Sequence, residues 1–257
     1  MRPMQFNRSL GPLVVSGDAR ALLAGVVLLA LLMNLGSWQL GRASEKSALQ
    51  ARWEQRAALP PVSPATLLTE RPEARADRQV AWLGQFAPDQ YLLLDNRLHR
   101  GRPGYHVIAL ASAEGLLVPV NLGWIAGDPA RKSLPVPNLP EGEVSLTGRV
   151  YVPSGKPLMM QKPVAPASLP SPVQTLYWKN WSAELADLVG QPLLPFEIRI
   201  EPNSPVALTA EWPVVNQSSS QHIGYALQWF AMAAVLFLIG IWRLTNVGEL
   251  LGSRNRV

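Results

Sequence analysis

The residues best suited to chemistry stand where a polar loop meets a long apolar run. The sequence SSSQHIGYALQWFAMAAVLFLIGIW extends from Ser218 to Trp242, and its His222 is one of 3 histidines in the chain. A neutral imidazole can ligate iron through one ring nitrogen. Tyr225 and Trp229 follow at helical spacings of three and four residues, so they share a helical face with His222. This face could ligate a metal and stack a flat aromatic ligand.

A second motif carries similar residue types next to another apolar run. The stretch GSWQLGR ends at Arg42, with Gln39 and Trp38 three and four residues inward from it. Counted at about 1.5 Å per residue, both motifs lie at comparable depths in one leaflet of a bilayer. A porphyrin could stack on the aromatic rings while Arg42 and Lys46 pair with its propionates. The residues expected at such a haem site are His222, as the ligand of the iron, with Tyr225, Trp229, Trp38 and Arg42.

The same residues are also typical of helix ends at a membrane surface. Tryptophan and tyrosine concentrate there because a ring with a polar tip prefers that depth. A contact between Gln39 and Gln228 would then only join two helices, contributing about 1 kcal/mol. Position alone favours this interfacial belt with an incidental histidine over a haem site.

Two uncharged runs must position both motifs. One lies between Arg20 and Arg42, the other between His222 and Arg243. Each has about twenty residues, enough to cross about 30 Å of hydrocarbon. A cleaved secretory signal is the alternative for the first run, but the cleavage site is poor and we expect a retained anchor.

The positive charges predict an orientation, because they collect at the outer flanks of the two runs. The flanking arginines are Arg2, Arg8 and Arg20 before the first run, and Arg243, Arg254 and Arg256 after the second. We therefore expect a cytoplasmic tail (1–20), a transmembrane helix (21–41), an extracytoplasmic, periplasmic domain (42–221), a transmembrane helix (223–242) and a cytoplasmic tail (243–257).

Composition excludes several kinds of site. Only 16% of the 257 residues are charged, and 48% are hydrophobic. With no cysteine, the chain has no disulfide, thiolate zinc site, iron–sulfur cluster or covalently attached c-type haem. The net charge of +5 includes no lysine or arginine run typical of nucleic-acid binding. Phosphate-binding glycine loops and hydrolase motifs are absent from the sequence, so we do not expect an enzyme.

Between the two runs, short apolar and β-branched segments predict one antiparallel sheet or small barrel. A turn is expected at APDQ (87–90), and His99 and His106 are expected at the surface or a strand edge. One helix is expected over 183–189, capped by Ser182 and ended by Gly190, and a proline-rich loop over 153–175. The predicted strands are 78–86, 91–98, 105–111, 115–125, 142–153 and 193–202. The fold class is a membrane protein of the α+β type, with two transmembrane helices flanking one β-rich extracytoplasmic domain.

Four stretches in order resemble the surfeit locus protein 1 family of cytochrome c oxidase assembly factors. They are LGSWQLGRASEK, GYHVIALA with LLVPVNLGWI, LPEGEVSLTGRVYVP and HIGYALQWFAMA. One position departs from the family pattern: Leu122 stands where an arginine usually precedes the Gly-Trp pair. Asn121, Gly123 and Trp124 remain, and we interpret them as structural.

The resemblance implies a chaperone in the biogenesis of a haem–copper oxidase in the bacterial inner membrane. It also implies transient binding of haem a, with His222 as ligand, and its delivery to the catalytic subunit. The implied partners are that subunit, other assembly factors and membrane lipid, and not nucleic acid. A haem-free scaffold that binds oxidase subunits is the main alternative. An enzyme acting in the proline-rich outer loops is a third.

Overall fold

The computed structural model describes residues 5–153, 164–213 and 218–253. Its internal contacts divide the chain into two units. The first, here called the helical unit, comprises Met1–Ala51 and Val214–Val257, and the second, the β-domain, comprises Arg52–Pro213. Residues 42–51, which belong to the predicted extracytoplasmic segment 42–221, continue the first long helix.

The helical unit contains two long helices, α1 (Ala19–Ala57) and α4 (Ser219–Leu244). Both are long and apolar enough to cross a membrane, with mean hydropathies of 2.0 and 1.8 over their most apolar windows. Only 6% and 11% of these windows are buried, unlike the core helices of a soluble protein. The protein is thus a membrane protein of the α+β class, as predicted. The sequence EKSALQARWEQRA continues α1 to Ala57, as its run of helix-forming residues before Pro60-Pro61 predicts.

A β-hairpin that the sequence analysis missed precedes α1. Strands β1 (Gln5–Leu10) and β2 (Leu13–Asp18) pair antiparallel around Gly11, whose φ of 61° suits glycine. The hairpin is tied to the segment after α4, because Asn246 Oδ1 accepts a hydrogen bond from the Val14 amide at 2.8 Å. A short helix, α5 (Val247–Ser253), follows.

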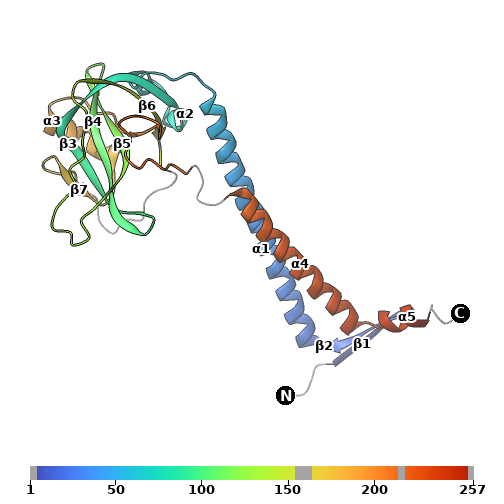
Figure 1. The fold of residues 1–257 in the computed structure, drawn as a ribbon. Helices are drawn as coiled ribbons and strands as arrows, with labels where there is room; N and C mark the ends of the chain where they lie inside the picture. Colours follow the sequence, from blue (N-terminus) through green and yellow to red (C-terminus); the bar gives the residue numbers. More distant parts are fainter. Residues whose placement is uncertain (1–4, 154–163, 214–217, 254–257) are drawn as a thin grey trace. The chain divides into compact units, whose positions relative to one another are not determined.

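The β-domain is built on a six-stranded sheet with the order β4-β5-β8-β6-β3-β7. An additional pairing between β3 and β4 closes β3, β4, β5, β8 and β6 into a small barrel (Figure 1). Most pairings are antiparallel, but β5–β8 and β3–β7 are parallel, so the sheet is mixed. The strands are β3 (Gln79–His99), β4 (Arg102–Ala113), β5 (Leu116–Ala126), β6 (Glu143–Tyr151), β7 (Ser171–Val173) and β8 (Glu197–Ile200).

The predicted turn at 87–90 is wrong, because β3 runs through it as one strand. Residues 79–85 pair with β6, and the strand pairs with β4 from Phe86 onward. A register shift between Phe86 and Tyr91 takes up the extra residues. Such irregularities bend a strand, and here the bend lets β3 pass from one neighbour to the other and close the barrel.

Aliphatic side chains fill the barrel, including the fully buried Val80, Val107 and Leu146. Helix α3 (Trp178–Val189) covers an apolar patch outside it, where Trp181 and Leu185 pack on Leu92, Leu94, Ile108, Leu110 and Leu117.

The predicted start of α3 is wrong. The helix begins at Trp178 rather than after Ser182, and no side chain caps it. Trp178 and Trp181 are buried against the sheet, so packing rather than a polar cap determines where the helix starts. Its end is as predicted, since Gly190 adopts a left-handed conformation with a φ of 72°.

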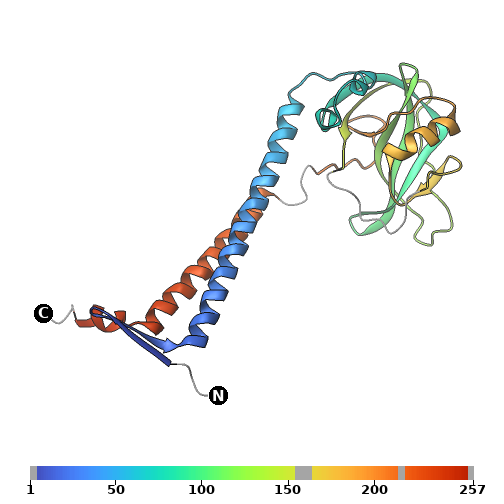
Figure 2. The same cartoon turned by 180° about the vertical axis from the view of Figure 1, so that it is seen from behind.

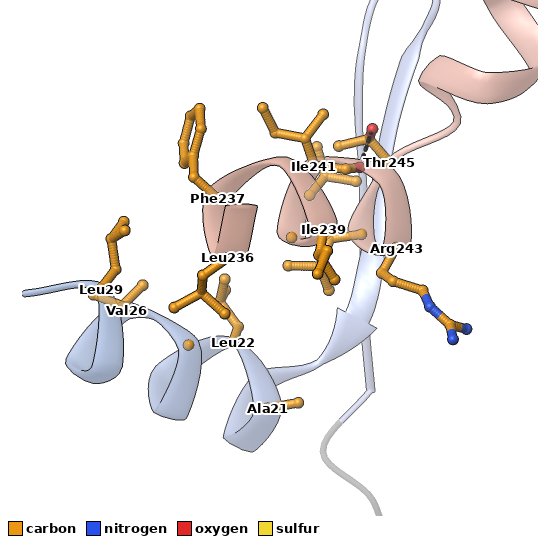
Figure 3. Close-up of a pocket in the computed structure, with 14 residues that line it drawn as sticks. Ala21, Leu22, Val26, Leu29, Leu236, Phe237, Ile239, Ile241, Arg243 and Thr245 are labelled. Atoms are coloured by element: carbon orange, nitrogen blue, oxygen red, sulfur yellow. Dashed lines mark hydrogen bonds between the residues drawn. The ribbon is translucent and has the colours of Figure 1, made fainter. Parts of the chain in front are cut away.

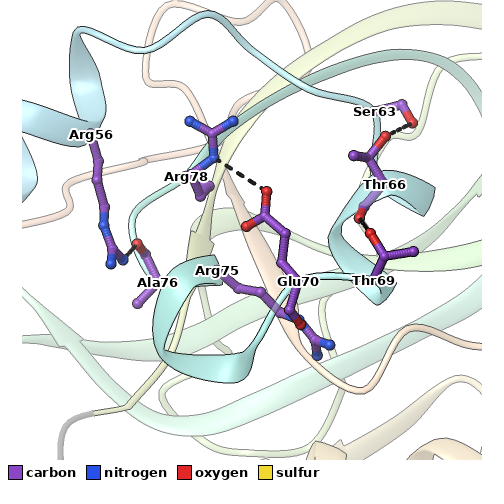
Figure 4. A network of polar contacts seen from close by, with 8 residues as sticks. All are labelled: Arg56, Ser63, Thr66, Thr69, Glu70, Arg75, Ala76 and Arg78. Atoms are coloured by element: carbon purple, nitrogen blue, oxygen red, sulfur yellow. Dashed lines mark hydrogen bonds and ion pairs between the residues drawn. The ribbon is translucent and has the colours of Figure 1, made fainter.

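Polar contacts hold the entry to the β-domain, where two short helices, η1 (Ala65–Leu68) and α2 (Pro72–Arg75), precede β3 (Figure 4). Arg75 donates hydrogen bonds to the carbonyls of Leu68 and Glu70, and Arg56 donates one to the Ala76 carbonyl. Within the predicted loop 153–175, β7 forms a short strand on β3, whereas residues 154–163 lie outside the described part of the chain.

Candidate functional site

The helices α1 and α4 lie side by side in both views (Figures 1 and 2), and small residues occupy several of their buried positions. A Cβ atom added at Gly36 would lie 2.6 Å from Cε1 of Phe230, so the ring packs directly on the glycine. Small residues in a membrane interface let backbones approach and strengthen van der Waals packing. The buried positions are Leu32, Gly36 and Ala43 on α1 and His222, Ala226 and Ala233 on α4.

His222 faces α1 from the first turn of α4 and is only 7% exposed. Its Nδ1 lies 2.8 Å from Oε1 of Gln39. An amide oxygen only accepts hydrogen bonds, so Nδ1 is the donor. The other ring nitrogen, Nε2, is buried and has no hydrogen-bond partner among the described residues. The predicted contact between Gln39 and Gln228 is wrong: Gln39 bonds His222, and Gln228 is exposed.

The other predicted site residues lie around this pair without closing over it. Trp38 and Tyr225 are 55% and 51% exposed, so both rings project from the surface of the helix pair. Trp229 is half-buried. Arg42 forms an ion pair of 2.5 Å with Glu45 on its own helix. The structure therefore brings His222 together with Gln39. The sequence placed Gln39 at a comparable depth but predicted Gln228 as its partner.

The far end of the helical unit contains a pocket with a largely apolar lining. A cavity of about 410 Å³ lies between the N-terminal part of α1 and the C-terminal part of α4 (Figure 3). Hydrocarbon side chains such as Leu22, Val26, Leu236 and Phe237 line it. Such a lining can accommodate hydrocarbon.

A comparison with models of known protein families shows to which family the chain belongs. The model of the SURF1 family matches residues 26–234, which is well over half of the chain. The chain belongs to the SURF1 family. This is a family of cytochrome oxidase assembly factors rather than of enzymes. No curated protein matches the chain. The family match begins inside α1 and ends inside α4, so it contains both motifs that meet at His222.

Leu122, where the resemblance implies an arginine, lies at a bulge in β5. The register between β4 and β5 shifts between the Val107–Gly123 and Ile108–Asn121 pairs, which leaves Leu122 as the extra residue. Leu122 is buried in the barrel core, where an aliphatic side chain packs without needing a polar partner. Gly123 has a φ of 108°, a conformation that glycine adopts without strain.

Asn121 connects this bulge to a buried polar cluster. Its Oδ1 accepts a hydrogen bond from the Gly123 amide at 3.2 Å, and its Nδ2 donates to Glu197 at 3.4 Å. Glu197 is 3% exposed and also faces Trp178 Nε1 at 3.5 Å and Arg199 Nε at 3.5 Å. Sequence analysis missed this cluster, because Glu197 belongs to an ordinary alternating strand that gives no signal of burial.

Aromatic rings surround the arginine of this cluster. The Arg199 guanidinium lies 3.3 Å from the ring centroid of Tyr151 and 4.9 Å from that of Trp212. His106 contacts the same Trp212 edge-on, with ring centroids 5.5 Å apart. Burial lowers the pKa of His106 to about 4, helped by the positive charges of Arg97 and Arg199.

The prediction that His106 lies at the surface or a strand edge is wrong, because it lies within β4, which pairs with both β3 and β5 at this residue. His106 is neutral at neutral pH, and His99 packs on Trp124 with ring centroids 5.1 Å apart. No three His, Cys, Asp or Glu side chains in the described residues gather as metal ligands.

Proposed function

We propose that this SURF1 protein binds haem a transiently through His222 and passes it to the catalytic subunit of a haem–copper oxidase. The supporting observation is Nε2 of His222, a buried nitrogen without a hydrogen-bond partner among the described residues. Leaving such a group unsatisfied costs about 1–3 kcal/mol. A nitrogen kept in this state is suited to a ligand that is present only part of the time.

The residues around His222 fit a haem that is released again. Bound haem supplies an iron that accepts an imidazole nitrogen as axial ligand. Trp38 and Tyr225 expose their rings on the same end of the helix pair and would offer flat apolar contacts. Arg42 would exchange its contact with Glu45 for a propionate, a charge-assisted bond of the same kind. With one protein ligand and a few surface contacts, the haem would be bound loosely. This suits a haem carrier better than a protein that retains its haem.

The proposed location is the bacterial inner membrane, with both termini in the cytoplasm and the β-domain in the periplasm. The excess of arginine at the outer flanks of both apolar helices supports this orientation. In this location His222 lies near the periplasmic surface of the membrane. The partners would be the oxidase catalytic subunit, other assembly factors and the surrounding lipid.

A haem-free scaffold is the alternative, and the burial of His222 favours it. In that case the bond to Gln39 only joins the helices, and the helix surface binds oxidase subunits. The two functions differ in a simple measurement on the purified full-length protein.

The test is the absorption spectrum of protein purified from cells that make haem a. We expect a Soret band in the wild-type protein, its loss in His222→Ala, and its retention in the control His99→Ala. Co-purification with the catalytic subunit is measured in parallel. Absence of the band from the wild-type protein, or a band that His222→Ala leaves unchanged, would overturn haem ligation at this residue. Retained subunit binding without any band would favour the scaffold.

A further inference from the structure

The bond between Gln39 and His222 does more than join two helices, because it acts on the imidazole itself. The two residues are 183 positions apart in sequence and come from different helices, yet Oε1 and Nδ1 lie 2.8 Å apart. His222 is buried and Gln39 is half-buried. Near hydrocarbon little water competes for such a bond, so the amide strongly determines which ring nitrogen carries the hydrogen.

A neutral imidazole has one N–H, and its position decides which nitrogen can ligate a metal. Because Gln39 Oε1 accepts a hydrogen bond from Nδ1, the lone pair lies on Nε2. Nε2 is also the nitrogen left without a partner among the described residues. We propose that Gln39 is a positioning residue that fixes the tautomer and the ring orientation of His222, so that Nε2 is the ligating nitrogen. The iron in this inference rests on the proposed function, whereas the tautomer does not.

The choice of an amide over a carboxylate has a chemical consequence. A carboxylate on the far nitrogen of a ligating histidine raises the basicity of the ligand and strengthens the metal bond. The neutral amide of Gln39 orients the ring in the same way but accepts a weaker hydrogen bond from Nδ1–H than a carboxylate would. The pair therefore gives a defined ligand of moderate strength, which suits a protein that must release its haem.

The first test uses the protein without haem and reads the tautomer directly. In full-length protein labelled with ¹⁵N-histidine in lipid bilayers, we expect His222 to show a protonated Nδ1 and an unprotonated Nε2. Gln39→Met keeps a similar volume but removes the acceptor, so we expect the Nε2-protonated tautomer to appear. Gln228→Met, at an exposed glutamine of α4, is the matched control and should leave the signals unchanged. An unchanged tautomer in Gln39→Met overturns the positioning role.

The second test uses haem a as the probe. We expect Gln39→Met to weaken haem binding about 10- to 100-fold, the usual effect of losing a partner that orients a ligand. Gln39→Glu introduces a carboxylate, which is a stronger acceptor than the amide. This variant should bind haem more tightly than wild type, and its bound haem should have a lower reduction potential. Potentials and affinities that are equal in all three proteins would overturn the proposal. A wild-type protein without haem would refute the proposed function, while the tautomer experiment would still decide the role of Gln39.

Discussion

Replacing Gly36 by alanine should disturb His222 without touching it. The added Cβ would lie 2.6 Å from Cε1 and 2.7 Å from Cζ of Phe230. Carbon atoms pack at about 3.5–4.0 Å, so the ring must move by about 1 Å, and we expect the helix that carries it to move with it. Gln39 is three residues further along α1, on nearly the same face. A movement of about 1 Å there would stretch the bond between Gln39 and His222 from 2.8 Å to beyond hydrogen-bonding distance.

The expected loss is the free energy of that bond, about 1 kcal/mol, together with the strain at Phe230. Alanine is a better helix former than glycine by about 1 kcal/mol, which works in the opposite direction. Gly41→Ala on the same helix controls for this gain, since a Cβ at Gly41 would meet nothing within 4 Å. The contact is therefore tested by the difference between the two alanine variants.

The assay is the ¹⁵N spectrum of His222 in bilayers, supported by haem affinity. We expect Gly36→Ala to broaden or shift the Nδ1–H signal and Gly41→Ala to leave it as in wild type. Adding Phe230→Ala to Gly36→Ala should restore the signal, because it removes the ring that obstructs the new methyl group. An unaltered His222 signal in Gly36→Ala would refute the reasoning, since it would mean that the ring rotates away while the helices stay in place.

Three further predictions concern the β-domain, measured by denaturant unfolding of the full-length protein in detergent and by hydrogen exchange of its strands. Leu146→Ala should destabilise the domain by about 2–5 kcal/mol because Leu146 is fully buried, whereas Leu83→Ala, at a side chain that is 65% exposed, should change it little. An equal effect of the two would contradict the assigned core. Glu197→Gln should lower the free energy of unfolding by about 3 kcal/mol, because it leaves the Arg199 charge without its buried partner. Adding Arg199→Gln should recover part of this loss. Because the pKa of His106 is about 4 in the folded protein against 6.5 for the free side chain, the unfolded state binds more protons between these values. Stability should therefore fall by at most about 3 kcal/mol as the pH drops from 6.5 to 4, and a His106→Gln variant with the same pH profile would contradict this.

The sequence predicted those parts of the fold that depend on composition. Uncharged runs of membrane length appear as α1 and α4, and β-branched segments appear as strands. Features decided by long-range packing were missed. The start of α3 depends on the burial of Trp178, the continuity of β3 on barrel closure, and the N-terminal hairpin on its contact with Asn246.

The candidate site follows the same division. Depth along a helix can be predicted from the sequence, so the motif that contains Gln39 and the motif that contains His222 could be placed at comparable depths. The sequence does not predict the rotation of a helix about its axis precisely enough to tell which of two neighbouring residues faces the other helix. Tyr225, three residues from His222, therefore lies on the exposed side, while Ala226, four residues away, faces the partner helix. Which residue of α1 bonds the imidazole depends on this rotation and required the structure.

Closure of the barrel limits how the β-domain can recruit another protein. Each of the five strands in the ring has a neighbouring strand on both sides, although β5 and β8 pair only at Val120–Ile198 and Asn121–Arg199. At the end of the sheet order, in the described part of the domain, lies β7, which is three residues long with Pro172 at its centre. Proline has no N–H to donate, and a strand this short offers few backbone groups for pairing with an added strand. β-Augmentation at β7 is therefore disfavoured, and a partner that binds at this end of the sheet would be recognised through side chains and loops.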